Sequence, residues 1–134
     1  MKKKGTRAER ELLHLFFENK WASARIAGSG STTMPAPDLV AGGSGRVLAI
    51  ECKAGKDNRY LTNKEIKELV EFSECFGAEA WVGVRFDNLG WFFLKTEDLR
   101  ESKGGNWFVN VDIAKKKGLS FNELIGKFKQ VKLE

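Results

Sequence analysis

The sequence is poor in the residues that hold structural metals or form disulfides. Its 134 residues include one histidine, His14, and two cysteines, Cys52 and Cys75. The cysteines have no CxxC spacing and form no cluster with the histidine, so we expect no structural zinc site. Both cysteines fall within apolar runs, which predicts buried free thiols. A lone histidine in the middle of a helical pattern predicts a surface or partly buried residue rather than a member of a catalytic triad.

Long hydrophobic runs are also absent. No apolar stretch reaches the roughly 20 residues that a membrane-spanning helix needs. The first residues, MKKKGTRAERELL, contain lysines but no apolar segment after them, which is not the pattern of a secretory signal. We therefore expect a cytoplasmic protein in a reducing compartment, with no segment embedded in a membrane.

What the sequence does contain is typical of a basic globular domain. Hydrophobic residues make up 42% of the chain, and its length predicts a single domain over residues 1–134. The formal net charge of +5 favours an anionic partner. Nucleic acid, an acidic protein and a membrane surface all fit that charge.

Hydrophobic periodicity and turn residues predict a mixed β-sheet flanked by helices. The predicted helices cover residues 5–20, 62–77 and 120–131, and the predicted strands cover 21–27, 38–42, 46–55, 78–86, 90–95 and 106–111. Each helix begins with the spacing of a capping box, at Thr6–Glu9, Thr62–Glu65 and Ser120–Glu123. A glycine-rich turn joins the second and third strands into a hairpin. The Gly/Ser/Thr/Pro segment 28–37 is predicted to be a loop, and its length favours a functional one.

One strand carries charged side chains among apolar ones. In LAIECKAG, residues 48–55, Glu51 and Lys53 are two positions apart and therefore share one face of the strand. The alternate, apolar residues point to the other face and can pack in a core. Asp38 begins the preceding strand. Pairing of the two strands through a turn at residues 43–44 would place Asp38 close to Glu51.

Two adjacent carboxylates favour a metal site. Without a partner, Asp38 and Glu51 would raise each other's pKa, whereas a divalent cation such as Mg²⁺ binds carboxylate oxygens and keeps positions for water and phosphate. Lys53 is suited to orienting an attacking water or to stabilising charge on a phosphate. These residues predict phosphodiester hydrolysis. They are equally compatible with a solvated ion pair on an exposed strand.

The pattern PD…ECK resembles the PD-(D/E)xK motif of the restriction-endonuclease-like nucleases. Over roughly residues 4–95, the chain is similar in order and spacing to the archaeal Holliday-junction resolvases, in KGTRAERELL, ARIAGSGS, PAPDLVAG, LAIECKAG and EFSECFGAEAWVGVRF. The resemblance implies a restriction-endonuclease-like α/β fold, with a mixed sheet of about five strands flanked by helices. It also implies a homodimer that nicks the two strands of a four-way DNA junction symmetrically, using Mg²⁺ or Mn²⁺, in homologous recombination and repair.

The resemblance implies roles for four residues of a catalytic site. Glu9, Asp38 and Glu51 match the family's metal-binding acids, and Lys53 matches its catalytic lysine. Glu9 would then turn toward the site instead of completing a capping box with Thr6.

Several other residues are expected to contact DNA. By resemblance, Arg10 and Arg25 match basic residues needed for DNA binding or cleavage. Ser29 matches the serine of a mobile loop beside the site, and the resemblance assigns it to both catalysis and DNA binding. The repeated SGS leaves open whether Ser29 or Ser31 is that serine. Basic residues near the N-terminus and after the catalytic strand are suited to neutralising backbone phosphates, and they are Lys2, Lys3, Lys4, Arg7, Arg10, Lys56 and Arg59. We expect recognition of DNA shape, because no helix aligns side chains for base edges.

The resemblance places Phe72 and Phe76 at a two-fold dimer interface, which needs a self-complementary apolar patch. It implies a nucleoid-associated enzyme with a DNA junction and a second copy as partners, and no membrane partner. Two other functions fit the residues. One is a nuclease of the same superfamily that cuts duplex or flap DNA. The other is a non-catalytic DNA-binding module whose E-x-K is structural, in which case Glu51→Gln would leave function intact.

Overall fold

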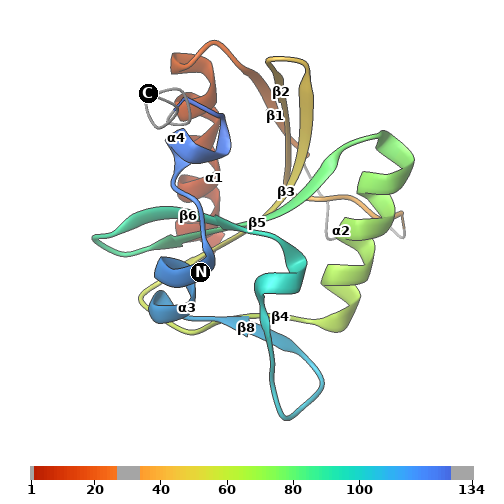
Figure 1. Ribbon diagram of the computed structural model, residues 1–134, viewed down its shortest axis with the longest axis vertical. Coiled ribbons are helices and arrows are strands. Elements are labelled where there is room, and N and C mark those ends of the chain that lie inside the picture. Colours follow the sequence, from red (N-terminus) through yellow and green to blue (C-terminus); the bar gives the residue numbers. More distant parts are fainter. Residues whose placement is uncertain (1, 27–33, 128–134) are drawn as a thin grey trace.

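The centre of the structure is a mixed sheet of five strands (Figure 1). The computed structural model describes residues 2–26 and 34–127, with side chains from residue 5 onward. The strands are β1 (Ala22–Arg25), β2 (Leu39–Gly43), β3 (Arg46–Gly55), β5 (Glu79–Phe86) and β6 (Gly90–Leu94), in that spatial order. β3 and β5 run parallel, and the other neighbours are antiparallel. The predicted α/β fold with a mixed sheet of about five strands is therefore confirmed.

Two helices cover opposite faces of this sheet. α1 (Lys2–Glu18) places Leu12 and Phe16, four residues apart, in one core with Ile50 of β3. α2 (Asn63–Phe76) places Leu69 in a second core with Ala49 of β3. Neighbouring residues of a strand point to opposite faces, so β3 contributes side chains to both cores.

The turns around β3 have the residues that their conformations require. In the β2–β3 hairpin, Ser44 and Gly45 have positive φ angles of 51° and 74°, as a two-residue type I′ turn needs. The connection from β3 to β5 contains α2, whose predicted capping box is present between Thr62 and Glu65. Gly77 ends this helix in the left-handed region, with φ of 79°.

A second, smaller sheet is only partly predicted by the sequence pattern. β8 (Trp107–Val109) lies within the predicted strand 106–111, and it pairs with β4 (Arg59–Leu61) and β7 (Arg100–Glu101) in the order β4-β8-β7. β4 and β7 have three and two residues, too few for an alternating pattern to identify them. The pattern also does not predict η2 (Thr96–Asp98) or α3 (Val111–Lys117), which begins after the capping side chain of Asn110.

Two predicted helix boundaries are wrong. α1 begins at Lys2, because lysines continue a helix readily, so Thr6 lies inside the helix and is not its N-cap. α4 (Phe121–Leu124) keeps the predicted Ser120–Glu123 capping box but ends at Leu124, short of the predicted residue 131. Gly126 follows with φ of 84°, a conformation that stops a helix. Residues 128–131 of that prediction lie outside the described part of the chain.

The two thiols differ in burial. Cys75 is exposed, so its predicted burial is wrong; it lies two residues after the buried Ser73 and thus on another side of α2. Cys52 is half-buried against the core beneath α1, and burial raises the pKa of its thiol well above the ordinary value.

His14 is exposed on α1, as expected. Within the described ranges, no helix is long and apolar enough to cross a membrane.

Candidate active site

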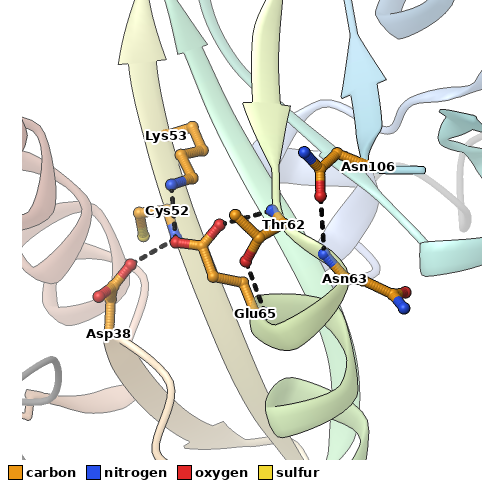
Figure 2. A network of polar contacts seen from close by, with 7 residues as sticks. All are labelled: Asp38, Cys52, Lys53, Thr62, Asn63, Glu65 and Asn106. Atoms are coloured by element: carbon orange, nitrogen blue, oxygen red, sulfur yellow. Dashed lines mark hydrogen bonds and ion pairs between the residues drawn. The ribbon is translucent and has the colours of Figure 1, made fainter. Parts of the chain in front are cut away.

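The candidate site lies where β2 begins beside β3. Leu39, the first residue of β2, pairs with Ile50, and the same register extended by one residue sets Asp38 opposite Glu51, as predicted. The Asp38 carboxylate accepts a hydrogen bond from the backbone N–H of Cys52, with 2.8 Å between Oδ2 and N (Figure 2). The pairing of β2 with β3 ends at Leu39 and Ile50, before Cys52. The Asp38 side chain therefore takes the place of the missing strand and satisfies this N–H.

The four residues predicted for catalysis and described in the structure line one cavity. Its volume is about 370 Å³, and its walls are formed by Glu9, Ala36, Asp38, Glu51, Cys52, Lys53, Glu65 and Glu68. α1, β3, α2 and the segment just before β2 each contribute carboxylates. Residues far apart in sequence therefore converge on a strongly acidic cavity beside one lysine.

The environment of Glu51 opposes its ionisation. Burial, the nearby Asp38 carboxylate and the nearby Glu65 carboxylate raise the pKa of Glu51 from 4.5 to about 9, with burial the largest cause. Lys53 acts in the opposite direction but does not offset the others. Without a bound cation, Glu51 is therefore protonated at neutral pH, as expected for adjacent carboxyls in a low-dielectric site.

The lysine of the site is held by a residue of α2. Lys53 Nζ lies 3.0 Å from Oε2 of Glu65, and both side chains are partly buried (Figure 2). The sequence identifies Glu65 only as the capping-box partner of Thr62. Its contact with Lys53 depends on how α2 packs across the sheet, which no local pattern indicates.

On the other side of the cavity, Glu9 of α1 pairs with Arg25 of β1. Arg25 Nε donates to Glu9 Oε1 at 2.7 Å. The side chain of Glu9 keeps only 16% of its surface exposed, so this ion pair is shielded from solvent. The structure thus turns Glu9 into the cavity and toward an arginine that the sequence also selected.

This arrangement can be compared with known proteins. The family model described as archaeal Holliday junction resolvase (Hjc) matches residues 1–133. The chain belongs to this family. A crossover junction endodeoxyribonuclease Hjc from Archaeoglobus fulgidus is 39% identical over 131 residues, covering 97% of this chain and 95% of the relative. A crossover junction endodeoxyribonuclease Hjc from Methanocaldococcus jannaschii is 35% identical over 133 residues, covering 98% of this chain and 94% of the relative.

A solved structure supports the same assignment. The structure of Archaeoglobus fulgidus Hjc, described as a Holliday junction resolvase, superposes with a TM-score of 0.83 and 36% sequence identity. The match covers 91% of this chain and 98% of the other. The family's fold therefore extends into the C-terminal third, where the motifs in the sequence were weakest.

The donor set fits a hard divalent cation, the kind of cofactor that this class of nuclease uses. Across residues 2–26 and 34–127, no three His, Cys, Asp or Glu side chains are grouped closely enough to hold an ion as they stand. Asp38 and Glu51 are nonetheless adjacent oxygen donors, and the raised pKa of Glu51 reflects a repulsion that a cation would relieve. Glu9 lines the same cavity as a third oxygen donor.

The basic residues selected from the sequence and described in the structure differ in their surroundings. Arg10 and Lys56 are exposed, while Arg7 lines a different cavity with Arg85. Arg59 folds back on its own turn and donates to backbone carbonyls, including that of Ala54 at 3.1 Å. The side chains of Lys2, Lys3 and Lys4, as well as Ser29 and Ser31, lie outside the described part of the structure.

α2 carries an aromatic pair in its last two turns. Phe72 and Phe76 stack with ring centroids 4.9 Å apart and an interplanar angle of 22°. Phe72 packs partly against the second core, whereas Phe76 remains 55% exposed. An exposed, ordered phenylalanine next to a partly buried one is suited to an apolar contact with another molecule.

Proposed function

We propose that the protein is a structure-specific endonuclease that resolves four-way DNA junctions by metal-dependent hydrolysis of phosphodiester bonds. The observation that carries this proposal is the convergence of Asp38, Glu51 and Lys53 on one cavity at the start of β2. Membership of the resolvase family and the names of the relatives support the substrate. A nuclease of this kind acts inside the cell on the nucleoid, in recombination and repair.

Four residues of the cavity are assigned roles in this reaction. Asp38 and Glu51, with Glu9, would hold Mg²⁺, for which Mn²⁺ can substitute. When bound, the ion lowers the pKa of a water and offsets negative charge on the phosphate. The Lys53 ammonium donates hydrogen bonds to the attacking water or to a phosphate oxygen, and its charge stabilises the charge that develops there.

Arg25 and Arg10 are proposed to serve substrate binding. The Arg25 guanidinium holds the Glu9 carboxylate on the cavity wall at 2.7 Å and keeps other N–H groups for a phosphate. Arg10 is exposed on α1, close in sequence to Glu9. Together with Lys56 and the N-terminal lysines, it would neutralise backbone phosphates without reading sequence.

Symmetric cleavage requires two active sites. One cavity per chain provides one nick, so we propose a homodimer related by a two-fold axis, with Phe72 and Phe76 of α2 in the interface. Two nicks in strands of the same polarity then follow from the symmetry of the enzyme and of the junction.

The test uses an end-labelled synthetic four-way junction, a linear duplex of the same sequence and a 5′ flap, each with Mg²⁺ and with EDTA. We expect paired, symmetric nicks only in the four-way junction and only when Mg²⁺ is present. Equal cutting of duplex or flap would indicate a general nuclease of this superfamily. Junction binding without any cutting would overturn the proposal in favour of a binding module.

A further inference from the structure

The first turn of α2 is tied to the candidate site through a single carboxylate. Oε1 of Glu65 accepts the backbone N–H of Thr62 at 2.9 Å, and the Thr62 hydroxyl accepts the backbone N–H of Glu65 at 3.0 Å. The other oxygen, Oε2, accepts a hydrogen bond from Lys53 Nζ at 3.0 Å (Figure 2). Glu65 therefore caps the helix with one oxygen and binds the lysine with the other.

The same turn is anchored on its far side. The backbone N–H of Asn63, which no helical carbonyl can satisfy, donates to Oδ1 of Asn106 at 3.3 Å (Figure 2). The Asn63 side chain in turn accepts from the indole N–H of Trp107 at 3.2 Å. Contacts thus run without interruption from the β7–β8 hairpin through the start of α2 to Lys53.

This anchoring is what a flexible lysine needs. A lysine has a long stem with many rotamers, so one exposed to solvent has no fixed position. The capping box fixes the Glu65 side chain at both its backbone and its Oε1 atom, so Oε2 is a rigid acceptor. With 26% of the Lys53 side chain exposed, against 34% for Glu65, the ion pair is partly shielded from solvent.

Capping of α2 alone does not explain why residue 65 is a glutamate, because its charge repels that of Glu51. Its negative charge is one of the causes that raise the pKa of Glu51. A glutamine at this position could cap the helix equally well without that repulsion. What a carboxylate at this position provides, and a glutamine does not, is the ion pair with Lys53.

We infer that Glu65 is a positioning residue for the reaction, which holds the Lys53 ammonium at the place where it meets the phosphodiester. The inference rests on the proposed function, because Lys53 is the group that acts on the phosphate there. Glu65 is assigned no direct contact with substrate or metal, and it acts through Lys53. Its effect is therefore on the rate of nicking and not on the affinity for the junction.

The decisive variant is Glu65→Gln. Glutamine keeps an oxygen for the N–H of Thr62 but turns a donor toward Lys53, so the cap survives and the ion pair is lost. We expect the single-turnover rate of junction nicking to fall roughly 10- to 100-fold. The Kd for the junction in EDTA stays at its wild-type value and the Tm does not fall. Glu65→Gln nicking at the wild-type rate would overturn the inference.

Two control variants separate the lysine contact from capping. Glu123→Gln changes the same position of the capping box of α4, where the carboxylate contacts Ser120 in the same way, and should nick at the wild-type rate. Thr62→Ala removes the hydroxyl that accepts from the Glu65 N–H but keeps the Thr62 N–H that holds Oε1, so the ion pair remains. It should lower the Tm and reduce the rate measured well below that Tm far less than Glu65→Gln does. A rate loss in Thr62→Ala equal to that in Glu65→Gln would assign the effect to the cap and overturn the inference.

A metal titration and Lys53→Met complete the test. If Glu65 were a metal ligand, Glu65→Gln would weaken Mn²⁺ binding to the free protein, measured by electron paramagnetic resonance; we expect binding that is unchanged or tighter. An inactive Lys53→Met with a fully active Glu65→Gln would overturn only the role of Glu65. Wild-type nicking by Lys53→Met would overturn the proposed role of Lys53 and this inference with it.

Discussion

Oδ2 of Asp38 accepts a hydrogen bond from the backbone N–H of Cys52 at 2.8 Å, and this contact fixes the first acid of the PD…ExK pattern beside the second. The bond satisfies a donor that β2 does not reach. It also prevents the Asp38 carboxylate from turning away from Glu51 to relieve repulsion. The fold therefore holds two carboxyls together although this opposes ionisation of Glu51, and a divalent cation stabilises such an arrangement.

The stability of the metal-free protein should fall as pH rises. The folded state keeps a proton on Glu51 up to about pH 9, whereas the unfolded state loses it near 4.5. Between these values the folded state binds more protons, so the free energy of unfolding decreases with pH. From pH 6 to 8.5 the loss is at most about 3 kcal/mol, at 1.36 kcal/mol per unit. Urea unfolding in EDTA measures it.

Glu51→Gln provides the control for this pH effect. Glutamine cannot ionise, so the slope between pH 6 and 8.5 should disappear and the variant should be more stable than the wild type at the upper end. Glu11 and Glu79, whose pKa values are lowered by their arginine partners, stay charged throughout this window. An equal slope in both proteins would show that Glu51 is not the group responsible.

Replacing Glu9 by glutamine should raise the Mg²⁺ requirement. Glu9→Gln keeps an oxygen for Arg25 Nε and removes a negative charge from the cavity. We expect the Mg²⁺ concentration for half-maximal nicking to rise roughly 10-fold, with little change in Tm. Glu11→Gln is the matched control, because Glu11 lies on the same helix and binds Arg85 at 2.7 Å outside this cavity. Equal Mg²⁺ requirements in the two variants would count against Glu9 as a metal ligand.

Charge on the exposed face of α2 should dissociate the proposed dimer. Phe76→Asp places a carboxylate in the proposed interface, so we expect a monomer by sedimentation velocity and a loss of paired nicks. Phe17→Asp changes an equally accessible phenylalanine, 59% exposed against 55% for Phe76, on a different helix. Only the first variant should change the sedimentation coefficient. A dimeric Phe76→Asp would place the interface elsewhere.

Lys56 and Arg59 should behave differently although both follow the catalytic strand. Lys56 is exposed, so Lys56→Ala should reduce the slope of log Kd against log salt by about 1 and leave the Tm unchanged. Arg59 donates to the carbonyls of Asp57, Asn58 and Ala54, so Arg59→Ala should cost about 1 kcal/mol of stability. An unchanged Tm in Arg59→Ala would show that these bonds contribute nothing.

The parts of the site that lie on one hairpin could be predicted from sequence. A two-residue turn fixes the register of β2 and β3, and strand alternation then sets Asp38, Glu51 and Lys53 on neighbouring positions. The capping box of α2 could be predicted for the same reason, since it depends on residues three positions apart.

The contacts between distant elements could not be predicted in this way. The ion pair of Lys53 with Glu65 depends on the packing of α2 across the sheet. Glu9 and Arg25 were each selected through resemblance, but their ion pair was not predicted. β4 and β7 are too short to show a period, and they form only when β8 supplies their hydrogen-bond partners. The local sequence pattern predicts helices, strands and the residues on each of their faces. Which charged side chains form ion pairs depends on how these elements pack together.

We propose that the cavity of Asp38, Glu51 and Lys53 hydrolyses junction phosphodiesters. The most direct measurement compares Glu51→Gln with the wild type on one end-labelled four-way junction, with single-turnover nicking followed in Mg²⁺ and binding followed in EDTA. We predict wild-type binding and a nicking rate lowered by at least about 100-fold. Symmetric nicking by Glu51→Gln at the wild-type rate would contradict the claim and place the catalytic site elsewhere on the protein.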